Sequence, residues 1–175
     1  AEGPEVLLAV GGLPHGGRAL LLAGHVDLGT GLRTAYGQLA AEELDLPLEQ
    51  LDVVLGDTVR GPNQGPTIAS ASIQIHAAPL RAAAAQARAW LLAQAAGRCG
   101  ADAATLRTAE GAVVAADGQR FTYAELIGDA HFELMLDPTA PLKDAADHRL
   151  IGTSAPRVDL QAKVRAEAVY VHDVR

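Results

Sequence analysis

The sequence has little cysteine, few aromatic residues and no long apolar run. Its single cysteine, Cys99, excludes an internal disulfide and a metal site built from several thiolates, and it indicates nothing about redox compartment. Aromatic residues make up only 3% of the 175 residues, so we expect an aliphatic core with little surface for stacking. No apolar run approaches the roughly 20 residues that cross a bilayer, and the sequence therefore predicts no membrane span.

Positive charge is also scarce. The chain carries 14 Lys and Arg against 21 Asp and Glu, a net charge of −7, and its basic residues are scattered singly. This balance argues against nucleic acid or an anionic membrane as a partner and favours small molecules or proteins. Apolar residues make up 49% and charged residues 20%, which is normal for a globular protein. The length suits one domain with a real core.

The first third of the sequence predicts an α/β (α+β) fold centred on a β-α-β unit. Short apolar runs at 5–10 and 18–26, separated by a glycine-rich turn, predict two strands joined by a hairpin-like loop. From 32 to 46 apolar residues recur every three or four positions, which is the helical period, and 51–55 is apolar and β-branched enough for a buried strand. We therefore expect a β-α-β sheet with helices packed on it.

The remainder of the chain alternates helices with short strands. The longest predicted helix runs from Ile73 to Ala95; Pro79 should kink it or split off its first turns, and Gly97 should end it. Further predictions are short strands at 105–106 and 112–115, a helix over 121–127 capped by Thr122 with Glu125 three residues on, extended chain from 137, and a strand-like run at 169–171.

Acidic and histidine side chains give weak signals. Glu42, Glu43 and Glu49 are most simply a solvated helix face. Glu42 and Glu43 are a poor acid/base pair, because sequence neighbours on a helix point about 100° apart. His15 and His25 flank the first turn with no second ligand at metal spacing, so both are expected to be structural.

Two glycine- and hydroxyl-bearing segments organise the chain. Gly29-Thr30-Gly31 follows the second strand, and the loop 65–72 follows the third. In a β-α-β unit both can lie at one edge of the sheet, where free backbone N–H groups and hydroxyls face one ligand, and the helix that begins after Gly31 suits an oxygen-rich anion. Within the loop, Ser70 fits a ligand role and an N-cap role about equally. The sequence thus predicts half of a binding site.

These segments belong to a longer set of motifs. Together the set resembles the molybdenum-cofactor-binding subunit of the xanthine dehydrogenase/aldehyde oxidase family, and within it the isoquinoline 1-oxidoreductase or nicotinate dehydrogenase type. The motifs cover nearly the whole chain in matching order: residues 24–34 (GHVDLGTGLRT), 41–44 (AEEL), 54–58 (VLGDT), 65–72 (GPTIASAS), 140–144 (APLKD), 152–164 (GTSAPRVDLQAKV) and 170–175 (YVHDVR).

The resemblance implies a cofactor and the residues that bind it. The cofactor is molybdopterin with molybdenum, in the cytosine dinucleotide form common in bacteria. No catalytic residue and no metal ligand is implied on this chain, because the base glutamate and the active-site loops lie elsewhere in the family. Many relatives carry glutamine where this chain has Thr30, so contact there is expected from the backbone. The implied cofactor-binding residues are Gly29, Thr30, Gly31, Thr67, Ser70, Ala71 and Ser72.

The resemblance also implies a division of the chain and a set of partners. Residues 1–136 correspond to a molybdopterin-binding domain segment, 137–151 to an extended linker, and 152–175 to the start of an α/β hammerhead-type domain. The chain is then an N-terminal component of the large subunit of a molybdenum hydroxylase or dehydrogenase, inactive alone. Its partners are the remainder of that subunit, an iron–sulfur subunit with [2Fe-2S] clusters, and a cytochrome c or FAD subunit. The family likeness points to the periplasm, with the cytoplasm as alternative.

Two other interpretations stay open. The chain can be a non-catalytic structural or assembly fragment whose glycine turns are tight corners and whose apolar face needs a partner chain. It can also be a small nucleotide-binding protein that uses Gly29-Thr30-Gly31 as a phosphate loop, although the second half of either standard phosphate-loop signature is missing.

Overall fold

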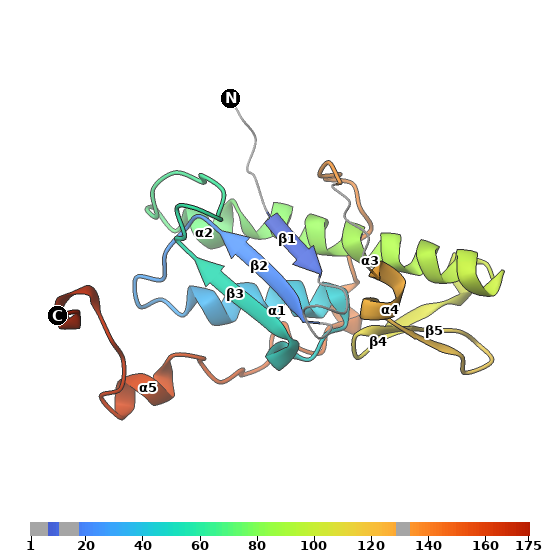
Figure 1. Ribbon diagram of the computed structural model, residues 1–175. Coiled ribbons are helices and arrows are strands. Elements are labelled where there is room, and N and C mark those ends of the chain that lie inside the picture. Colours follow the sequence, from blue (N-terminus) through green and yellow to red (C-terminus); the bar gives the residue numbers. More distant parts are fainter. Residues whose placement is uncertain (1–6, 11–17, 129–133) are drawn as a thin grey trace.

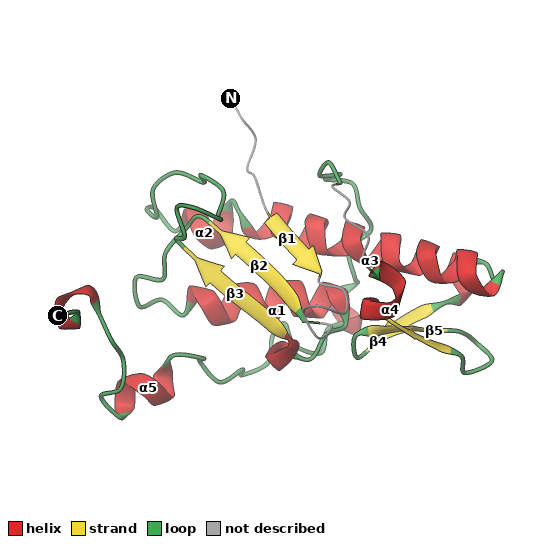
Figure 2. Cartoon of the chain, in the orientation of Figure 1, coloured by secondary structure: helices red, strands yellow, loops and turns green. Residues whose placement is uncertain are grey.

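The computed structural model describes residues 7–10, 18–128 and 134–175. Within these residues the chain forms two three-stranded sheets joined by a long helix, followed by an extended C-terminal segment with short helices (Figures 1 and 2). None of the described helices is both long and apolar enough to span a bilayer.

The first sheet contains the predicted β-α-β unit. Strand β1 (Leu7–Val10) pairs antiparallel with β2 (Ala19–Ala23), which confirms the predicted pair of strands. Strand β2 pairs in parallel with β3 (Leu51–Leu55), and α1 (Leu32–Leu44) makes the crossover between them. The predicted unit is therefore present, with parallel strands that are direct neighbours.

Helices α1 and α3 (Ala77–Cys99) pack on each other and cover one face of this sheet (Figure 1). Alternate residues of β2 are fully buried, as expected for a strand with one covered face. The core between the layers is aliphatic, as the composition predicts, with two buried tyrosines. Its largest fully buried apolar side chains are those of Leu21, Tyr36, Leu44, Leu80, Leu91 and Tyr123.

The long helix begins as predicted but ends later. The short helix α2 (Ala71–Gln74) is separated from α3, which confirms that the first turn splits off. Pro79 lies in the first turn of α3, where its missing N–H leaves no helical hydrogen bond unmade. The prediction that Gly97 ends the helix is wrong: the helix passes through Gly97 and stops at Gly100, whose φ of 69° is the left-handed conformation that closes helices.

The second sheet is an antiparallel meander of β4 (Arg107–Ala109), β5 (Ala112–Val114) and β6 (Arg120–Thr122). The strand expected at 105–106 starts two residues later, because the Asp102 side chain accepts from the Ala104 N–H and winds 103–105 into a 3₁₀ turn. Helix α4 (Tyr123–Ile127) has the predicted capping box between Thr122 and Glu125. The residue at the expected start of that helix, Phe121, pairs in β6 instead.

The C-terminal segment, residues 134–175, is mostly extended. It contains the short helix α5 (Leu160–Val164) and two 3₁₀ turns, η4 (Ala145–Asp147) and η5 (Val171–Asp173). A further 3₁₀ turn, η2 (Leu48–Gln50), leads into β3. The strand-like run at 169–171 is not a strand in the structure, since Asp173 accepts from the Tyr170 N–H and closes η5 instead.

Candidate functional site

Two loops leave the carboxyl ends of β2 and β3 at the same edge of the sheet (Figure 1). Side chains of the second loop hold the first. The Thr67 hydroxyl accepts from the Val26 N–H at 3.0 Å, and the Gln64 amide oxygen accepts from the Gly24 N–H at 2.8 Å. The predicted meeting of the two segments at one sheet edge is confirmed, whereas their contact with a cofactor stays a prediction.

The N-terminus of α1 already holds an anion, the carboxylate of Asp27. Its Oδ1 accepts hydrogen bonds from the backbone N–H groups of Gly29 and Gly31 at 2.9 and 3.0 Å. Its Oδ2 accepts one from the backbone N–H of Arg33 at 3.3 Å. Burial raises the pKa of Asp27, but these bonds and the nearby Arg157 guanidinium outweigh burial and leave the pKa below its usual value. The expectation of free N–H groups facing a ligand anion is therefore wrong for these three amides.

The surface of the first turn is open at Gly29 and Thr30 and covered at Gly31. Gly29 and Thr30 are exposed, and a Cβ added at Gly29 would meet no atom within 4 Å. Gly31 is buried beneath the side chain of Arg157. Both glycines have positive φ, 96° and 80°, so the turn needs residues without a Cβ. The Gly29 N–H and carbonyl are bound by Asp27 and Arg157, so the group that a ligand can reach here is the exposed Thr30 hydroxyl, which lies 3.5 Å from Asp27 Oδ1.

The second loop presents Ser70 to solvent in a strained backbone. Ala69 and Ser70 have φ of 51° and 57°, left-handed values that non-glycine residues rarely adopt. Ser70 precedes α2, yet its side chain makes no capping bond and is exposed. Ser70 is thus the N-cap residue of α2 by position, as one of the two interpretations expects, but its side chain does not cap the helix. The hydroxyl is available to a ligand, and strained loop residues of this kind gather at functional sites.

The other predicted residues of this loop have structural partners. The Thr67 hydroxyl accepts a hydrogen bond from the Val26 N–H and also contacts the His25 ring nitrogen Nδ1. Ala71 is the half-buried first residue of α2. The Ser72 carbonyl accepts from the buried hydroxyl of Tyr36 at 2.7 Å, and burial raises the pKa of Tyr36 to about 12. These contacts fix the loop against α1.

Two histidines pack together beneath the loops. His25 is fully buried; its Nδ1 lies 3.2 Å from the Thr67 hydroxyl, and its ring meets the His76 ring edge to face with centroids 4.5 Å apart. Burial lowers the pKa of both rings, and each keeps a buried nitrogen without a hydrogen-bond partner, Nε2 of His25 and Nδ1 of His76. The structural interpretation of His25 is confirmed, while His15 lies outside the described residues.

The prediction of a solvated acidic face on α1 is wrong for two of its three residues. Glu42 and Glu43 are 1% and 0% exposed, whereas Glu49 is exposed as expected. Glu43 binds Arg81 at 2.5 Å and Arg88 at 3.4 Å, both on α3. Glu42 Oε2 accepts three consecutive backbone N–H groups, from residues 149–151, at 2.6 to 3.0 Å. These ion pairs and hydrogen bonds offset the free-energy cost of burying the two carboxylates.

Lys143 completes this buried charge cluster. Its ammonium lies 3.5 Å from Glu42 and 2.5 Å from Asp45, and its backbone N–H donates to Glu43 at 3.1 Å. The sequence contains a signal for the burial of Glu42 and Glu43, because both lie between Ala41 and Leu44, which belong to the apolar side of the helix. The cluster fastens the C-terminal segment to α1 and α3.

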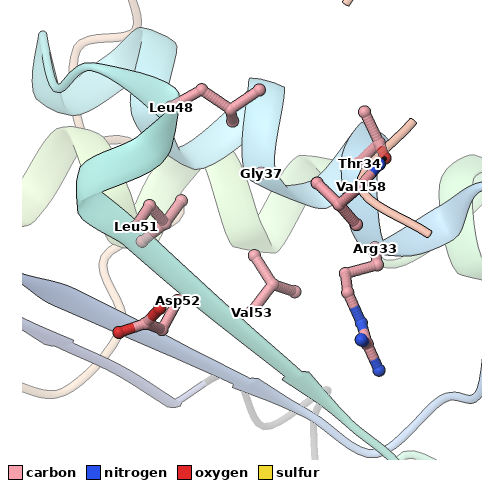
Figure 3. A pocket seen from close by; sticks show the side chains of 8 residues that line it. All are labelled: Arg33, Thr34, Gly37, Leu48, Leu51, Asp52, Val53 and Val158. Carbon is pink, nitrogen blue, oxygen red and sulfur yellow. Dashed lines mark hydrogen bonds between the residues drawn. The ribbon is translucent and has the colours of Figure 1, made fainter. Parts of the chain in front are cut away.

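A hollow of about 260 Å³ lies between α1 and β3, and Val158 of the C-terminal segment also lines it (Figure 3). Leu48, Leu51 and Val53 line it on one side, and Gly37 of α1 faces them. None of the seven predicted cofactor-binding residues lines this hollow. Across the described parts of the chain, no group of three or more His, Cys, Asp or Glu side chains is placed to hold a metal ion.

The fold is shared with parts of two solved enzymes. The structure superposes with a TM-score of 0.59 on CO dehydrogenase from Oligotropha carboxidovorans, at 22% identity, over 68% of this chain and 15% of that one. It superposes with a TM-score of 0.57 on quinoline 2-oxidoreductase from Pseudomonas putida 86, at 21% identity, over 76% of this chain and 17% of that one. These superpositions define the class of fold, a mixed helix and sheet domain like those of these enzymes.

The sequence places the chain within a family. The family profile described as "Molybdopterin cofactor-binding domain" matches residues 12–170. The chain therefore belongs to the molybdopterin cofactor-binding domain family, and the resemblance drawn from its motifs is confirmed. Its place in that family makes a molybdopterin with molybdenum the cofactor of the domain.

Two curated relatives agree with the expected branch. Over 152 residues the chain is 54% identical to a nicotinate dehydrogenase subunit of Pseudomonas putida, covering 87% of this chain and 13% of the relative. It is 31% identical to the beta subunit of isoquinoline 1-oxidoreductase from Brevundimonas diminuta over 191 residues, covering 86% of this chain and 24% of the relative. The chain thus spans about an eighth and a quarter of the lengths of these relatives.

Proposed function

We propose that this chain is an N-terminal component of the molybdopterin-binding large subunit of a molybdenum hydroxylase or dehydrogenase. The complete enzyme oxidises an N-heteroaromatic or aldehyde substrate with oxygen derived from water. The observation that carries this proposal is the 54% identity to the nicotinate dehydrogenase subunit of Pseudomonas putida. That relative favours a nitrogen heteroaromatic over an aldehyde as the substrate class.

The open edge of the two loops fits a neutral, hydrogen-bonding part of the cofactor. Gly29 and Gly65 leave free space where a side chain would stand, and the hydroxyls of Thr30 and Ser70 are exposed. Backbone and hydroxyl groups of this kind suit the heteroatoms of a pterin. When bound, the cofactor supplies the oxygen-transfer and redox chemistry. The residues of this chain bind it from one side and orient it, and the predicted set remains Gly29, Thr30, Gly31, Thr67, Ser70, Ala71 and Ser72.

The wider assembly follows from the same relationship. We infer the cytosine dinucleotide form of the cofactor, [2Fe-2S] clusters on a separate iron–sulfur subunit, and a cytochrome c or FAD subunit as a further electron carrier. The described structure supports a role in a larger assembly through its many exposed large apolar side chains. The division at 137–151 and 152–175 into linker and hammerhead start, and a periplasmic or else cytoplasmic location, belong to the same proposal.

The proposal is tested by loading of the assembled subunit. Thr30→Val combined with Ser70→Ala removes both exposed hydroxyls without adding bulk or a β-branched residue at the left-handed position 70, and should lower the pterin and molybdenum content of the purified subunit several-fold. Thr105→Val is the matched control, because Thr105 is exposed at the far end of α3 from the loops. Unchanged pterin content in the double variant contradicts the assignment of the site. A correctly assembled wild-type subunit without pterin favours the alternative, a non-catalytic structural fragment.

A further inference from the structure

A polar stripe on α1 carries the C-terminal segment towards the first turn. Thr34, Gln38 and Glu42 are spaced four residues apart and so share one face of the helix. Glu42 accepts from the N–H groups of 149–151, Gln38 donates to the Leu150 carbonyl at 2.8 Å, and Thr34 accepts from the Val158 N–H at 3.1 Å. Residues 149–158 therefore run antiparallel to α1, from its end to its start.

At the end of this path Arg157 reaches the first turn. Its Nη1 donates to the Gly29 carbonyl at 3.0 Å. Three atoms of its side chain lie 3.7 Å from the position that a Cβ on Gly31 would take, which is van der Waals contact. The other side of the guanidinium binds the Asp159 carboxylate through Nε at 3.0 Å and Nη2 at 2.7 Å. One planar fork thus joins the C-terminal segment to the turn.

Two charged side chains of opposite sign, Asp27 and Arg157, hold the turn from its two sides. Asp27 holds the N–H groups of Gly29, Gly31 and Arg33 from inside the turn, and Arg157 binds the Gly29 carbonyl from outside. The positive charge of Arg157 also faces Asp27 and helps to keep that carboxylate ionised. The conformation of residues 29–31 is therefore held by one local residue and by one residue 128 positions away in the sequence.

We propose that Arg157 is a positioning residue for the turn 29–31, so that docking of residues 149–159 on α1 is what presets this turn for its ligand. This inference rests on the proposed cofactor-binding role of the turn and assigns Arg157 a role through Gly29 and Gly31 rather than through contact with the cofactor. It couples the C-terminal segment to the cofactor site, so a movement of one changes the other.

Hydrogen exchange read by mass spectrometry tests this coupling in the full-length subunit without requiring a loaded cofactor. Arg157→Gln removes the charge and the fork, and should speed amide exchange in the peptide 27–35 about tenfold. Arg157→Lys keeps the charge but cannot hold Gly29 and Asp159 with one planar group, so it should restore exchange only in part. Arg165→Gln is the control, since Arg165 is exposed in the same segment, and should leave 27–35 unchanged.

Different results would overturn the role of Arg157 and the cofactor proposal. Unchanged exchange in 27–35 of Arg157→Gln, whether or not residues 149–159 exchange faster, overturns the inference. If Arg157→Gln does not fold, Asp159→Asn replaces it, because that change keeps Arg157 and removes only its partner; faster exchange in 27–35 then supports the inference and unchanged exchange overturns it. The cofactor proposal fails separately, if the Thr30 and Ser70 variants keep their pterin while Arg157→Gln still loosens the turn.

Discussion

Asp27 decides what the first turn can bind. A glycine turn that opens a helix is the usual place for a phosphate, because its N–H groups and the helix dipole favour negative charge. Here a carboxylate from the chain itself takes that place. Arg157 also binds the Gly29 carbonyl, so the exposed group that the turn offers a ligand is the Thr30 hydroxyl. At this position a neutral pterin ring is a better partner than a phosphate group.

Gly24 gives the sharpest test of a single residue. A Cβ at this position would lie 2.1 Å from the Pro62 carbonyl oxygen, a backbone atom that cannot move without shifting the second loop. Gly24→Ala should lower the free energy of unfolding by about 2 kcal/mol or more, measured by urea denaturation. Gly97→Ala is the control. That glycine is exposed within α3 with no atom near its missing Cβ, so alanine there should raise stability by about 0.5–1 kcal/mol. Equal effects of the two changes would contradict this account.

The histidine pair makes stability depend on pH. Burial lowers the pKa of His25 and His76 below the ordinary value of 6.5, so the unfolded chain binds protons that the folded chain does not. Stability from these residues is full above that value and is lost as pH falls below it towards the lowered values. Urea midpoints should therefore fall between about pH 7.5 and pH 5. His76→Phe keeps a ring at the contact and should flatten the slope; an unchanged slope would show that the pair does not titrate as described.

The sequence alone predicts some of these residue roles and not others. The need for glycine at 29 and 31 and the structural role of His25 were predictable, because turn geometry and metal spacing are local properties. The burial of Glu42 and Glu43 was not, since their partners lie 38 to 109 residues away along the chain. The occupation of the turn by Asp27 was readable in principle, because Asp27 is only two residues from Gly29.

At the scale of elements, α1 performs three separate tasks. Its apolar side packs on the sheet and on α3, its N-terminus carries the first turn, and its polar stripe of Thr34, Gln38 and Glu42 holds the C-terminal segment. A helix used on so many sides has little solvated surface. This explains why a simple amphipathic pattern identified the helix but assigned its acidic residues to solvent.

Glu42 is the main attachment of the C-terminal segment to α1. Glu42→Ala removes the acceptor of three backbone N–H groups and should lower the free energy of unfolding by about 2–4 kcal/mol in urea denaturation. Glu49→Ala, an exposed glutamate close by in sequence, should change stability by less than about 0.5 kcal/mol. A small effect at Glu42 would mean that the segment is held without it.

Acid should release the same attachment. Burial raises the pKa of Glu42, but the N–H groups of residues 149–151 and the charge of Lys143 outweigh it, so the pKa is below its ordinary value of 4.5. A lowered carboxylate pKa contributes stability that is present above the ordinary value and is lost as pH falls through the lowered one. Amide exchange of residues 149–151, corrected for intrinsic rates, should accelerate below about pH 4.5 in the wild type and already be fast in Glu42→Ala. Protection that persists in acid contradicts this role.

Secondary structure was predictable where the signal was local. The β-α-β unit, the separation of α2 from α3 and the capping box of α4 all follow from periodicity, proline and cap residues. The short second sheet was placed less well, because strands of three residues carry almost no period and β6 exists through pairing with β5. The run 169–171 has strand propensity but no strand partner within the described residues, so a turn forms instead.

As a whole molecule the chain exposes more surface than its size requires. Its accessible area is 10521 Å², whereas a compact monomer of 18.1 kDa exposes roughly 8,100 Å². Large apolar side chains stand on this surface in both loops and in the C-terminal segment, among them Val59, Ile68, Met135 and Val171, which are 62% to 93% exposed. Surfaces of this composition mark places where another protein surface packs.

Assembly with the rest of the subunit should cover these side chains. Hydroxyl-radical footprinting of the isolated chain should label Val59, Ile68 and Met135, and labelling should fall several-fold in the complete subunit. Fully buried Leu21 and Leu80 serve as internal references, since they should stay unlabelled in both samples. Equal labelling of the exposed set in both samples would show that this surface faces solvent in the assembled protein.

We propose that the edge formed by residues 24–31 and 65–72 holds a molybdopterin cofactor from one side within a larger subunit. The most direct measurement is the molybdenum and pterin content of the purified wild-type assembly that contains this chain, together with the identity of the chains in it. We expect molybdenum and pterin in a fixed ratio to this chain, and iron on a separate partner chain. A fully assembled particle that contains neither molybdenum nor pterin would contradict it.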